Sequence, residues 1–341
     1  MEEDGRYHMS SRPYCVKWTP DGALLAVGDD DSRVHVLDAS TRSVQRVLND
    51  SGAVDALPTL AICWRPEVGP RAQRHILLEG TCAGVLSHWH VPSGKRMHSV
   101  RQPGNAIHCL SYACDGWAFA TSGKDACVRI HEEATKSEVV VFKGGEERGS
   151  LVSSHVQQVF CVRFHNSNPQ LLASGGWDKV VHLWDVRTGK SVSTFSGPFM
   201  AGDCLDLHEN DLLAGSNGRE HQVCLFDLRR PGSAPATALT IEPAPGRRDD
   251  NDPYTVYACK FSRDPQRKLI GIGCGTAGSG NGVLKVYDRA ARQFVESIEL
   301  KGRSVYSLDF APPSLPATSL AFTAGSKAGS FVQVLEVSPS Q

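Results

Sequence analysis

A recurring unit constrains the fold of this chain more than any other feature of its sequence. Each unit opens with a short apolar segment that holds a small residue and, three positions later, a large apolar residue. Seven such units follow one another, and their large residues are 43 to 54 residues apart. The large residues are Trp18, Trp64, Tyr112, Phe164, Leu207, Phe261 and Phe310. Periods of about 40–50 residues are typical of β-propeller blades.

Each unit continues with further segments that read as strands. A second apolar segment runs into Gly or Ser, and a third alternates apolar with polar residues, as in residues 181–184. Strict alternation indicates a strand rather than a helix. A fourth, more variable segment follows most units, for example 43–48 and 191–195. Four antiparallel strands repeated about an axis form a propeller, so we predict an all-β, seven-bladed β-propeller.

The fourth unit carries the clearest motif, because residues 175–185 include a literal Trp177-Asp178 pair. This unit resembles the WD repeat, and the weaker units extend the resemblance over residues 14–337. In the WD-repeat family a His, a Ser or Thr, an Asp and a Trp form a buried hydrogen-bonded tetrad. The resemblance assigns a structural tetrad to His155, Ser174, Asp178 and Trp184. Units one to three lack the complete set, so we expect them to be held mainly by apolar packing.

We predict one propeller domain over residues 1–341. The expected blade cores are at about 14–48, 60–101, 107–142, 155–196, 203–241, 256–300 and 304–337. The last unit supplies three strands, so residues 6–12 are expected to add its outer strand. This closure resembles the one usual in the WD-repeat family, and it removes an open sheet edge.

Charge and composition exclude several functional classes. The formal net charge is −1, and no basic stripe occurs, which argues against a nucleic-acid partner. No apolar run approaches the roughly 20 residues of a membrane helix, and the acidic start at Met1 is unlike a secretory signal. We therefore expect a cytoplasmic protein without a membrane partner.

Cysteines and glycines offer no chemistry in the sequence. There are eleven cysteines and no Cys-x-x-Cys pair, which excludes a typical zinc site and argues against a disulfide framework. Cys15, Cys109, Cys161 and Cys204 occupy the small position of the first segment, where Cys packs as a small hydrophobe. Gly273-x-Gly275-x-x-Gly278 matches a dinucleotide fingerprint, but a strand pattern rather than a helix follows it.

The remaining motif with metal-ligand potential is His88-Trp89-His90, which lacks an evident third ligand. We predict no metal, no cofactor and no small-molecule substrate. No catalytic arrangement stands out, and propellers of the WD-repeat family rarely catalyse reactions. The chain is therefore not expected to be an enzyme.

In the WD-repeat family one face of the ring often binds peptides, and two sets of residues are expected there. The first set precedes the small residue of each unit and comprises Tyr14, Leu60, His108, Phe160, Asp203, Tyr257 and Tyr306. The second precedes the turn Asp or its equivalent and comprises Asp30, Lys124, Trp177 and Arg219. Clustered aromatic residues are typical of binding hot spots. Trp177 either contacts a partner or packs over a neighbouring loop.

Acidic residues near these aromatics suit a peptide bearing Arg or Lys. They are Asp29, Asp30, Asp31 and Asp203. Three long loops, at 66–73, 143–154 and 242–252, interrupt the repeat. We expect the last two to project on the same face as Trp177 and to become ordered when a partner binds.

These features predict a monomeric, non-catalytic scaffold that binds other proteins or peptides in a larger assembly. Residues 196–207 resemble a segment of small WD-repeat proteins from flagellated protists, which points to an axonemal or flagellar complex. The alternative is a peptide reader or substrate adaptor of the ubiquitin-ligase or chromatin type.

Overall fold

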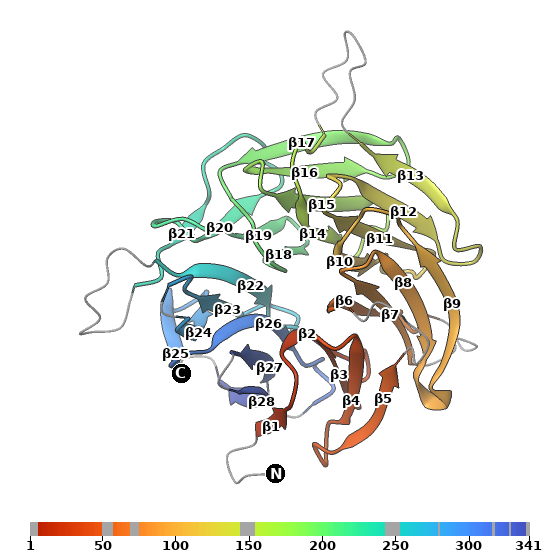
Figure 1. Ribbon diagram of the computed structural model, residues 1–341. Coiled ribbons are helices and arrows are strands. Elements are labelled where there is room, and N and C mark those ends of the chain that lie inside the picture. The colour runs from red at the N-terminus through yellow and green to blue at the C-terminus, as the bar shows by residue number, and fades with distance from the viewer. Residues whose placement is uncertain are drawn as a thin grey trace.

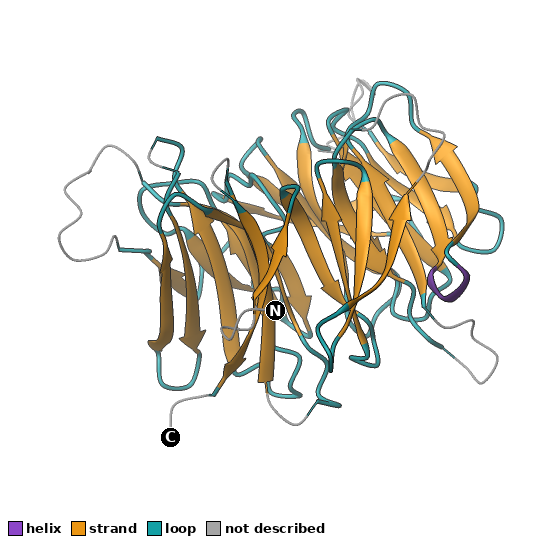
Figure 2. Cartoon of the chain, turned by 60° about the horizontal axis from the view of Figure 1, so that its bottom comes forward, coloured by secondary structure: helices purple, strands orange, loops and turns teal. Residues whose placement is uncertain are grey.

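The computed structural model is a ring of seven four-stranded antiparallel sheets, as predicted (Figure 1). The inner strands surround a central axis and the outer strands lie at the periphery. Seen from the side, the sheets stand next to one another, and their connecting loops gather on two opposite faces (Figure 2). The structure describes residues 6–49, 57–68, 75–143, 154–242, 253–278, 280–315, 318–326 and 329–338.

Six blades consist of strands that follow one another in the chain. Blade 1 contains β2 (Pro13–Trp18), β3 (Leu24–Asp29), β4 (Arg33–Asp38) and β5 (Val44–Asn49). Blade 2 contains β6 (Thr59–Trp64), β7 (Ile76–Thr81), β8 (Val85–His90) and β9 (Lys95–Arg101), with a 3₁₀ turn at Val91–Ser93. Blade 3 contains β10 (Ile107–Tyr112), β11 (Ala118–Gly123), β12 (Val128–Glu132) and β13 (Glu138–Phe142).

The second half of the ring repeats this order. Blade 4 contains β14 (Val159–Phe164), β15 (Leu171–Gly176), β16 (Val180–Asp185) and β17 (Lys190–Ser196). Blade 5 contains β18 (Leu205–His208), β19 (Asp211–Gly215), β20 (Val223–Asp227) and β21 (Thr237–Leu239). Blade 6 contains β22 (Thr255–Phe261), β23 (Leu269–Gly275), β24 (Gly282–Asp288) and β25 (Gln293–Leu300).

Blade 7 joins the two ends of the chain. Its strands are β26 (Ser304–Phe310), β27 (Thr318–Gly325), β28 (Ser330–Val337) and the N-terminal β1 (Arg6–Met9). β1 pairs antiparallel with β28, with Arg6 opposite Gln333 and Met9 opposite Ser330. The predicted closure by the N-terminal segment is confirmed, and Figure 1 shows β1 beside β28.

Burial differs between the second strand of a blade and its outer strand. Every residue of β3, β7 and β11 is buried, whereas all but one residue of β5 is exposed. The apolar clusters cross blade boundaries, because each sheet covers the face of the next; one cluster spans blades 4, 5 and 6. Among the described residues no helix has the length and apolarity needed to cross a bilayer.

Side chains of the inner strands also tie neighbouring blades together. The Asp309 carboxylate accepts a hydrogen bond from the backbone N–H of Trp18 at 2.9 Å, and Ser307 Oγ accepts one from Val16 at 3.1 Å. These two contacts join blade 7 to blade 1. Ser111 Oγ accepts the backbone N–H of Phe164 at 3.0 Å in the same way between blades 3 and 4.

The tetrad implied by the WD repeat is present in blade 4. His155 Nδ1 lies 2.7 Å from Asp178 Oδ2, and His155 Nε2 lies 2.7 Å from Ser174 Oγ. Trp184 Nε1 donates to the same Ser174 oxygen at 2.7 Å. Burial raises the pKa of Asp178, but the His155 hydrogen bond and charge outweigh this and hold that pKa below its usual value. The four side chains therefore form one satisfied network inside the blade.

Blade 2 contains a related network, which the sequence did not indicate. Glu79 pairs with Ile62 in the β6–β7 ladder, just as Ser174 pairs with Val162 in the β14–β15 ladder of blade 4. Glu79 therefore occupies the position that the serine has in the tetrad. Its carboxylate accepts hydrogen bonds from Trp89 Nε1 and from Thr59 Oγ1, each at 2.7 Å.

Blades 1 and 3 use other residues again. In blade 1, Asp29 accepts Ser11 Oγ and lies 2.9 Å from His35 Nε2. In blade 3, Gln102 Nε2 donates to Thr121 Oγ1 at 3.2 Å. Blades 1 to 3 therefore contain substitute polar networks in addition to the apolar packing that was expected to be their main support.

A partly buried ionic cluster braces the ring across its centre. Asp203, just before β18, accepts Lys17 Nζ of blade 1 at 2.8 Å, Arg163 of blade 4 at 2.8 Å and Lys260 Nζ of blade 6 at 2.7 Å. We call Asp203, Lys17, Arg163 and Lys260 the Asp203 cluster. Burial raises the pKa of Asp203, but the three cations more than offset it and hold that pKa well below the usual range.

We predict that Ser174→Ala destabilises the protein by about 2–4 kcal/mol. The change leaves the buried His155 Nε2 and Trp184 Nε1 without their partner, and each unsatisfied buried group costs about 1–3 kcal/mol. Urea denaturation measures the free energy of unfolding. Ser193→Ala in the same blade is the matched control, because Ser193 Oγ makes no hydrogen bond. Equal free energies for the two variants would show that the tetrad does not stabilise blade 4.

We predict that Asp203→Asn lowers the free energy of unfolding by about 3–5 kcal/mol, because it leaves three partly buried cations without a counter-charge. Asp31→Asn is the control, since its ion pair with Arg33 is exposed and should contribute about 0–1 kcal/mol.

The same cluster predicts a pH dependence. Because the folded pKa of Asp203 is depressed, its contribution is present above the unfolded pKa of about 4 and disappears as the pH falls through the folded value. The acid-induced loss of stability below about pH 4 should therefore be smaller in Asp203→Asn. Superimposable acid-unfolding curves for the variant and the wild type would count against this role.

Candidate functional site

Six of the seven inner strands contain a β-bulge at the same place, and this feature was not visible in the sequence. The register of each inner strand shifts across one residue, as between Pro13 and Cys15 in β2. The bulged residues are Tyr14, Leu60, His108, Phe160, Tyr257 and Tyr306. A bulge leaves one residue unpaired and re-aims its side chain. Here it turns six side chains away from the packed sheets.

The bulged residues line a single cavity of about 300 Å³ at one end of the central channel. We call this cavity the cup. Asp203 and Lys17 of the Asp203 cluster also line it. Every residue of the first predicted set therefore lies in the cup: Tyr14, Leu60, His108, Phe160, Asp203, Tyr257 and Tyr306. The structure brings together residues from all seven blades that the repeat alignment had placed at equivalent positions.

One wall of the cup continues into a row of stacked rings. His108 stacks on Phe160 with centroids 4.3 Å apart, Phe160 on Trp177 at 5.3 Å, and Trp177 on Phe199 at 6.0 Å. The interplanar angles are 12°, 28° and 14°. We call these four residues the aromatic row. Trp177 is 37% exposed, so it both packs over the loop that carries Phe199 and presents a surface to solvent.

The opposite wall holds three tyrosines from adjacent blades. Tyr306 lies between Tyr14 and Tyr257, with centroid distances of 5.6 Å and 5.4 Å. Arg12 donates to the Tyr14 hydroxyl at 3.5 Å. The cup is thus aromatic on two sides, and its apolar surface is interrupted at the bottom by Lys17 and Asp203.

The acidic residues expected to bind a basic peptide are mostly engaged within the protein. Asp203 already pairs with three cations, and Asp29 is fully buried in the blade 1 network. Asp30 accepts the backbone N–H of Arg12 at 2.7 Å. Of the four, Asp31 alone is exposed. The Asp203 carboxylate is therefore not available to an incoming Arg or Lys, because three protein cations surround it.

The second predicted set is only partly assembled. Trp177 reaches the cup through Phe160. Lys124 and Arg219 are exposed, and neither they nor Asp30 line the cup. Phe199, which completes the aromatic row, was missed by the sequence analysis. Its position in the loop before an inner strand was the available signal. Most of the long loops 66–73, 143–154 and 242–252 lies outside the described residues.

Two groups among the described residues place potential metal ligands within 4.8 Å of one another. One is His155, Asp178 and His182, but both nitrogens of His155 are used within the tetrad. Burial also lowers the pKa of His182 to about 4. The other is Asp21, Glu67 and His75, where the His75 ring already bonds to Asp21 at 3.2 Å. Neither group is a site aimed at an incoming ion.

Of the dinucleotide-like glycines, Gly273 and Gly275 lie in β23, whereas Gly278 lies in the connection to β24. The next element after β23 is β24, so among the described residues no helix N-terminus follows that could bind a pyrophosphate. His88 is fully buried against Glu133, whereas His90 Nδ1 bonds to Ser93 Oγ. All eleven cysteines are free thiols, and Cys15, Cys109, Cys161 and Cys204 are buried as expected.

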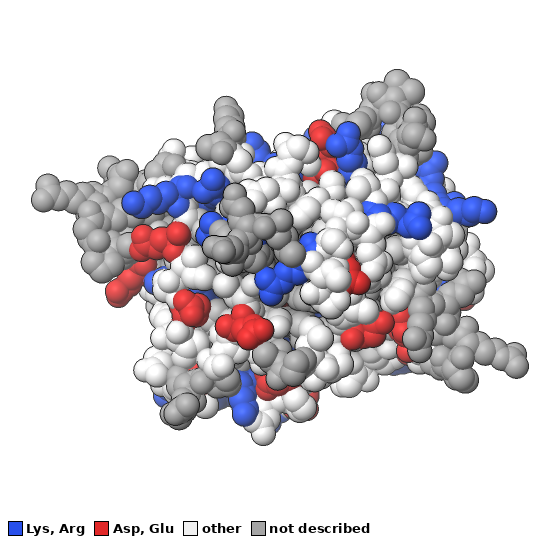
Figure 3. All heavy atoms as spheres, turned by 90° about the horizontal axis from the view of Figure 1, so that it is seen from below, with Lys and Arg blue, Asp and Glu red and all other residues white. Residues whose placement is uncertain are grey.

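Figure 3 shows separate groups of basic and acidic side chains on one side of the ring, with uncharged surface between them and no continuous basic patch among the residues coloured there. Nucleic-acid-binding surfaces normally show such a patch. This view is consistent with the formal net charge of −1.

Comparison with known proteins gives matches to WD-repeat sequences. The family model described as "WD domain, G-beta repeat" matches residues 6–38 and 146–185. A guanine nucleotide-binding protein subunit beta from Arabidopsis thaliana is 24% identical over 76% of this chain and 61% of its own length.

Two other relatives match shorter stretches. The WD repeat-containing protein slp1 of Schizosaccharomyces pombe is 26% identical over 52% of this chain and 33% of its own length. A U3 small nucleolar RNA-associated protein 15 homolog from Gallus gallus is 25% identical over 62% of this chain and 37% of its own length. The chain thus spans between a third and three fifths of these relatives. Together with the seven closed blades and the tetrad, these matches show that the chain contains WD repeats and is similar to WD-repeat β-propellers.

Proposed function

We propose that this propeller is a non-catalytic scaffold that holds a segment of a partner protein in the cup and along the aromatic row. The observation that carries the proposal is the convergence of bulged residues from six blades and Asp203 on one cavity. Since a ring with regular inner strands would not aim these side chains at one point, the arrangement favours a binding surface.

The aromatic row supplies the contact area for such a partner. Its rings are already stacked and fixed, so little side-chain entropy is lost when a partner covers them. Partly exposed aromatics in a concave, largely apolar surface match the composition of interface hot spots. The aromatic row extends the surface from the channel mouth to the outer loop that carries Phe199.

The cup favours an apolar or aromatic side chain over a basic one. Its walls are aromatic, and Lys17 also lines it. A second cation placed nearby would be repelled by the Lys17 ammonium, because like charges repel. The pKa of Lys17 itself is raised, because the attraction of Asp203 and Asp309 outweighs the burial of its ammonium, so Lys17 stays charged. A volume of about 300 Å³ accommodates one large side chain.

The assembly in which this scaffold works is a further part of the proposal. A cytoplasmic axonemal or flagellar complex rests on the resemblance of residues 196–207 alone. The alternative is a peptide reader or substrate adaptor that binds a short motif reversibly. Relatives named as a G-protein subunit, a nucleolar RNA-associated protein and a poly(A)+ RNA export protein favour protein assemblies in general and no single compartment. We propose protein partners rather than nucleic acid, and a single propeller as the binding unit.

We predict that Phe160→Ala combined with Trp177→Ala abolishes capture of specific partners from a native cell lysate, read by mass spectrometry. The double change removes the centre of the aromatic row and opens one wall of the cup. A loss of 2 kcal/mol or more at a hot spot corresponds to at least about a 30-fold loss of affinity. Val192→Ala is the control, because Val192 is 55% exposed on the outer strand of the same blade.

A circular-dichroism melt first establishes that both variants are folded. If the double variant captures the same partners as the wild type, the cup is not the dominant binding surface. Partners that are lost on a salt wash indicate the reversible reader, whereas partners retained through the wash favour a structural complex.

A further inference from the structure

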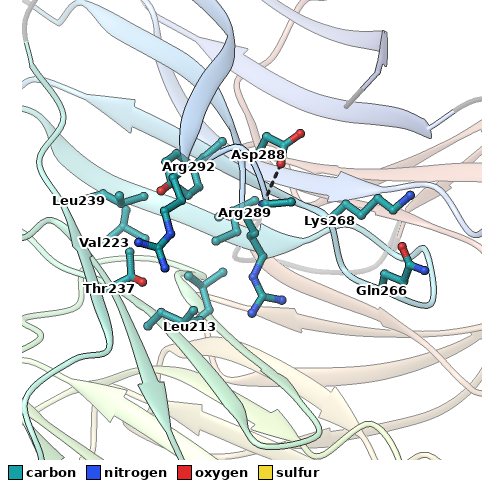
Figure 4. A pocket seen from close by; sticks show the side chains of 13 residues that line it. Leu213, Val223, Thr237, Leu239, Gln266, Lys268, Asp288, Arg289 and Arg292 are labelled. Atoms are coloured by element: carbon teal, nitrogen blue, oxygen red, sulfur yellow. Dashed lines mark hydrogen bonds between the residues drawn. The ribbon is translucent and has the colours of Figure 1, made fainter. Parts of the chain in front are cut away.

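A second concave surface lies between blades 5 and 6, and it shares no residue with the cup. We call it the blade 5–6 groove. It has a volume of about 540 Å³ (Figure 4). Residues of β19, β20 and β21 line one side, and residues of the β22–β23 loop, β23, the end of β24 and the β24–β25 turn line the other. Neither the repeat pattern nor the tetrad indicates it.

The groove lies beside a short outer strand of blade 5. β21 has three residues, whereas the outer strand of blade 6, β25, has eight. The segment between β20 and β21 contains Pro231 and Pro235. Proline has no backbone N–H to donate to a ladder, so these two residues add no hydrogen bond to the pairing of the edge strand β21 with β20. Blade 5 thus has a shorter outer strand than its neighbour, and the groove lies between the two blades.

The floor and walls of the groove are apolar. Blade 5 contributes Leu213, Val223, Leu225 and Leu239, and blade 6 contributes Ile270 and Tyr287. Leu225 and Leu239 are only partly buried. Tyr287 packs edge-on against Phe294 at 5.4 Å, and Phe294 is 37% exposed on β25. The apolar surface thus runs from the interior of the ring out to its periphery.

Cations surround this apolar surface. Lys268 and Arg292 are exposed, and within the described ranges neither lies within ion-pair distance of a carboxylate. Arg289 pairs with Asp211. The carboxylate of Asp288 is buried and accepts the backbone N–H groups of Ala290 and Ala291, so it offers no competing negative surface. Figure 4 shows Arg289 and Arg292 reaching from blade 6 toward Leu213 and Thr237 of blade 5.

We infer that the blade 5–6 groove is a docking site for an acidic segment of a partner protein that carries large apolar side chains. Leu or Phe side chains of the segment enter between the two blades, and its Asp or Glu side chains pair with Lys268 and Arg292. Charge complementarity selects this occupant, because a basic segment would meet unpaired cations at the rim. The groove lies apart from the cup, so one propeller holds two segments at once.

The test uses two labelled synthetic peptides with Leu and Phe at the same positions, one with Glu and the other with Lys at the intervening positions. Fluorescence anisotropy measures their binding to the full chain. We expect the Glu peptide to bind and the Lys peptide not to bind. Lys268→Glu combined with Arg292→Glu should weaken the Glu peptide at least about tenfold, since two attractive pairs become repulsive.

Matched variants separate this site from other surfaces. Lys190→Glu reverses an exposed cation on blade 4 and should leave the affinity unchanged. Phe160→Ala with Trp177→Ala should also leave it unchanged, which distinguishes failure of this inference from failure of the proposed cup. Methyl NMR should show shifts at Leu225, Leu239 and Ile270 and none at Leu60.

Three results would overturn the inference. The first is equal binding, or no binding, of the two peptides. The second is an equal loss of affinity in Lys190→Glu and in the groove variant. The third is a set of methyl shifts confined to the cup.

Discussion

Each blade of this protein has two apolar faces and can bury them only against its neighbours, so the fold depends on closing the ring. Blade 7 meets blade 1 through hydrogen bonds from Asp309 to Trp18 and from Ser307 to Val16. The N-terminal strand β1 then covers the open edge of β28. Closure therefore uses contacts between the two ends of the sequence, which lie beside each other in space.

A closed ring leaves a channel, and this protein fills its middle with charge rather than with apolar side chains. Asp203 draws Lys17, Arg163 and Lys260 from three other blades toward one point. Isolated, any of these charges would be costly to bury, whereas together they compensate one another. Lys17 and Asp203 of the cluster line the cup together with the bulged residues, so an ionic contact between distant blades forms part of the cup.

Departures from the regular repeat accompany both candidate binding surfaces. The bulges re-aim six side chains into the cup, and the blade 5–6 groove lies beside the short outer strand of blade 5. In blades 1 to 3 the departures have a different outcome, because Glu79, Asp29 and Gln102 rebuild a polar network with other partners. Inside blades 1 to 3, the missing tetrad residues are thus replaced by other hydrogen-bonded side chains. The bulges at the channel and the short outer strand of blade 5 instead accompany the two concave surfaces.

The sequence by itself determined the number of blades, the closing strand, the tetrad of His155 and Trp184, and the equivalence of the residues that line the cup. The number of blades follows from local alternation and from a fixed period, which a chain expresses residue by residue. The tetrad follows from the resemblance to the WD repeat, which also supports the closing strand and the choice of the cup residues. Only the tertiary structure decided that Asp203 pairs with three cations, that Phe199 extends the aromatic row, and that a groove separates blades 5 and 6. These depend on contacts between residues tens to hundreds of positions apart. Their distances are set by bulges, ring closure and strand lengths, none of which a linear pattern records.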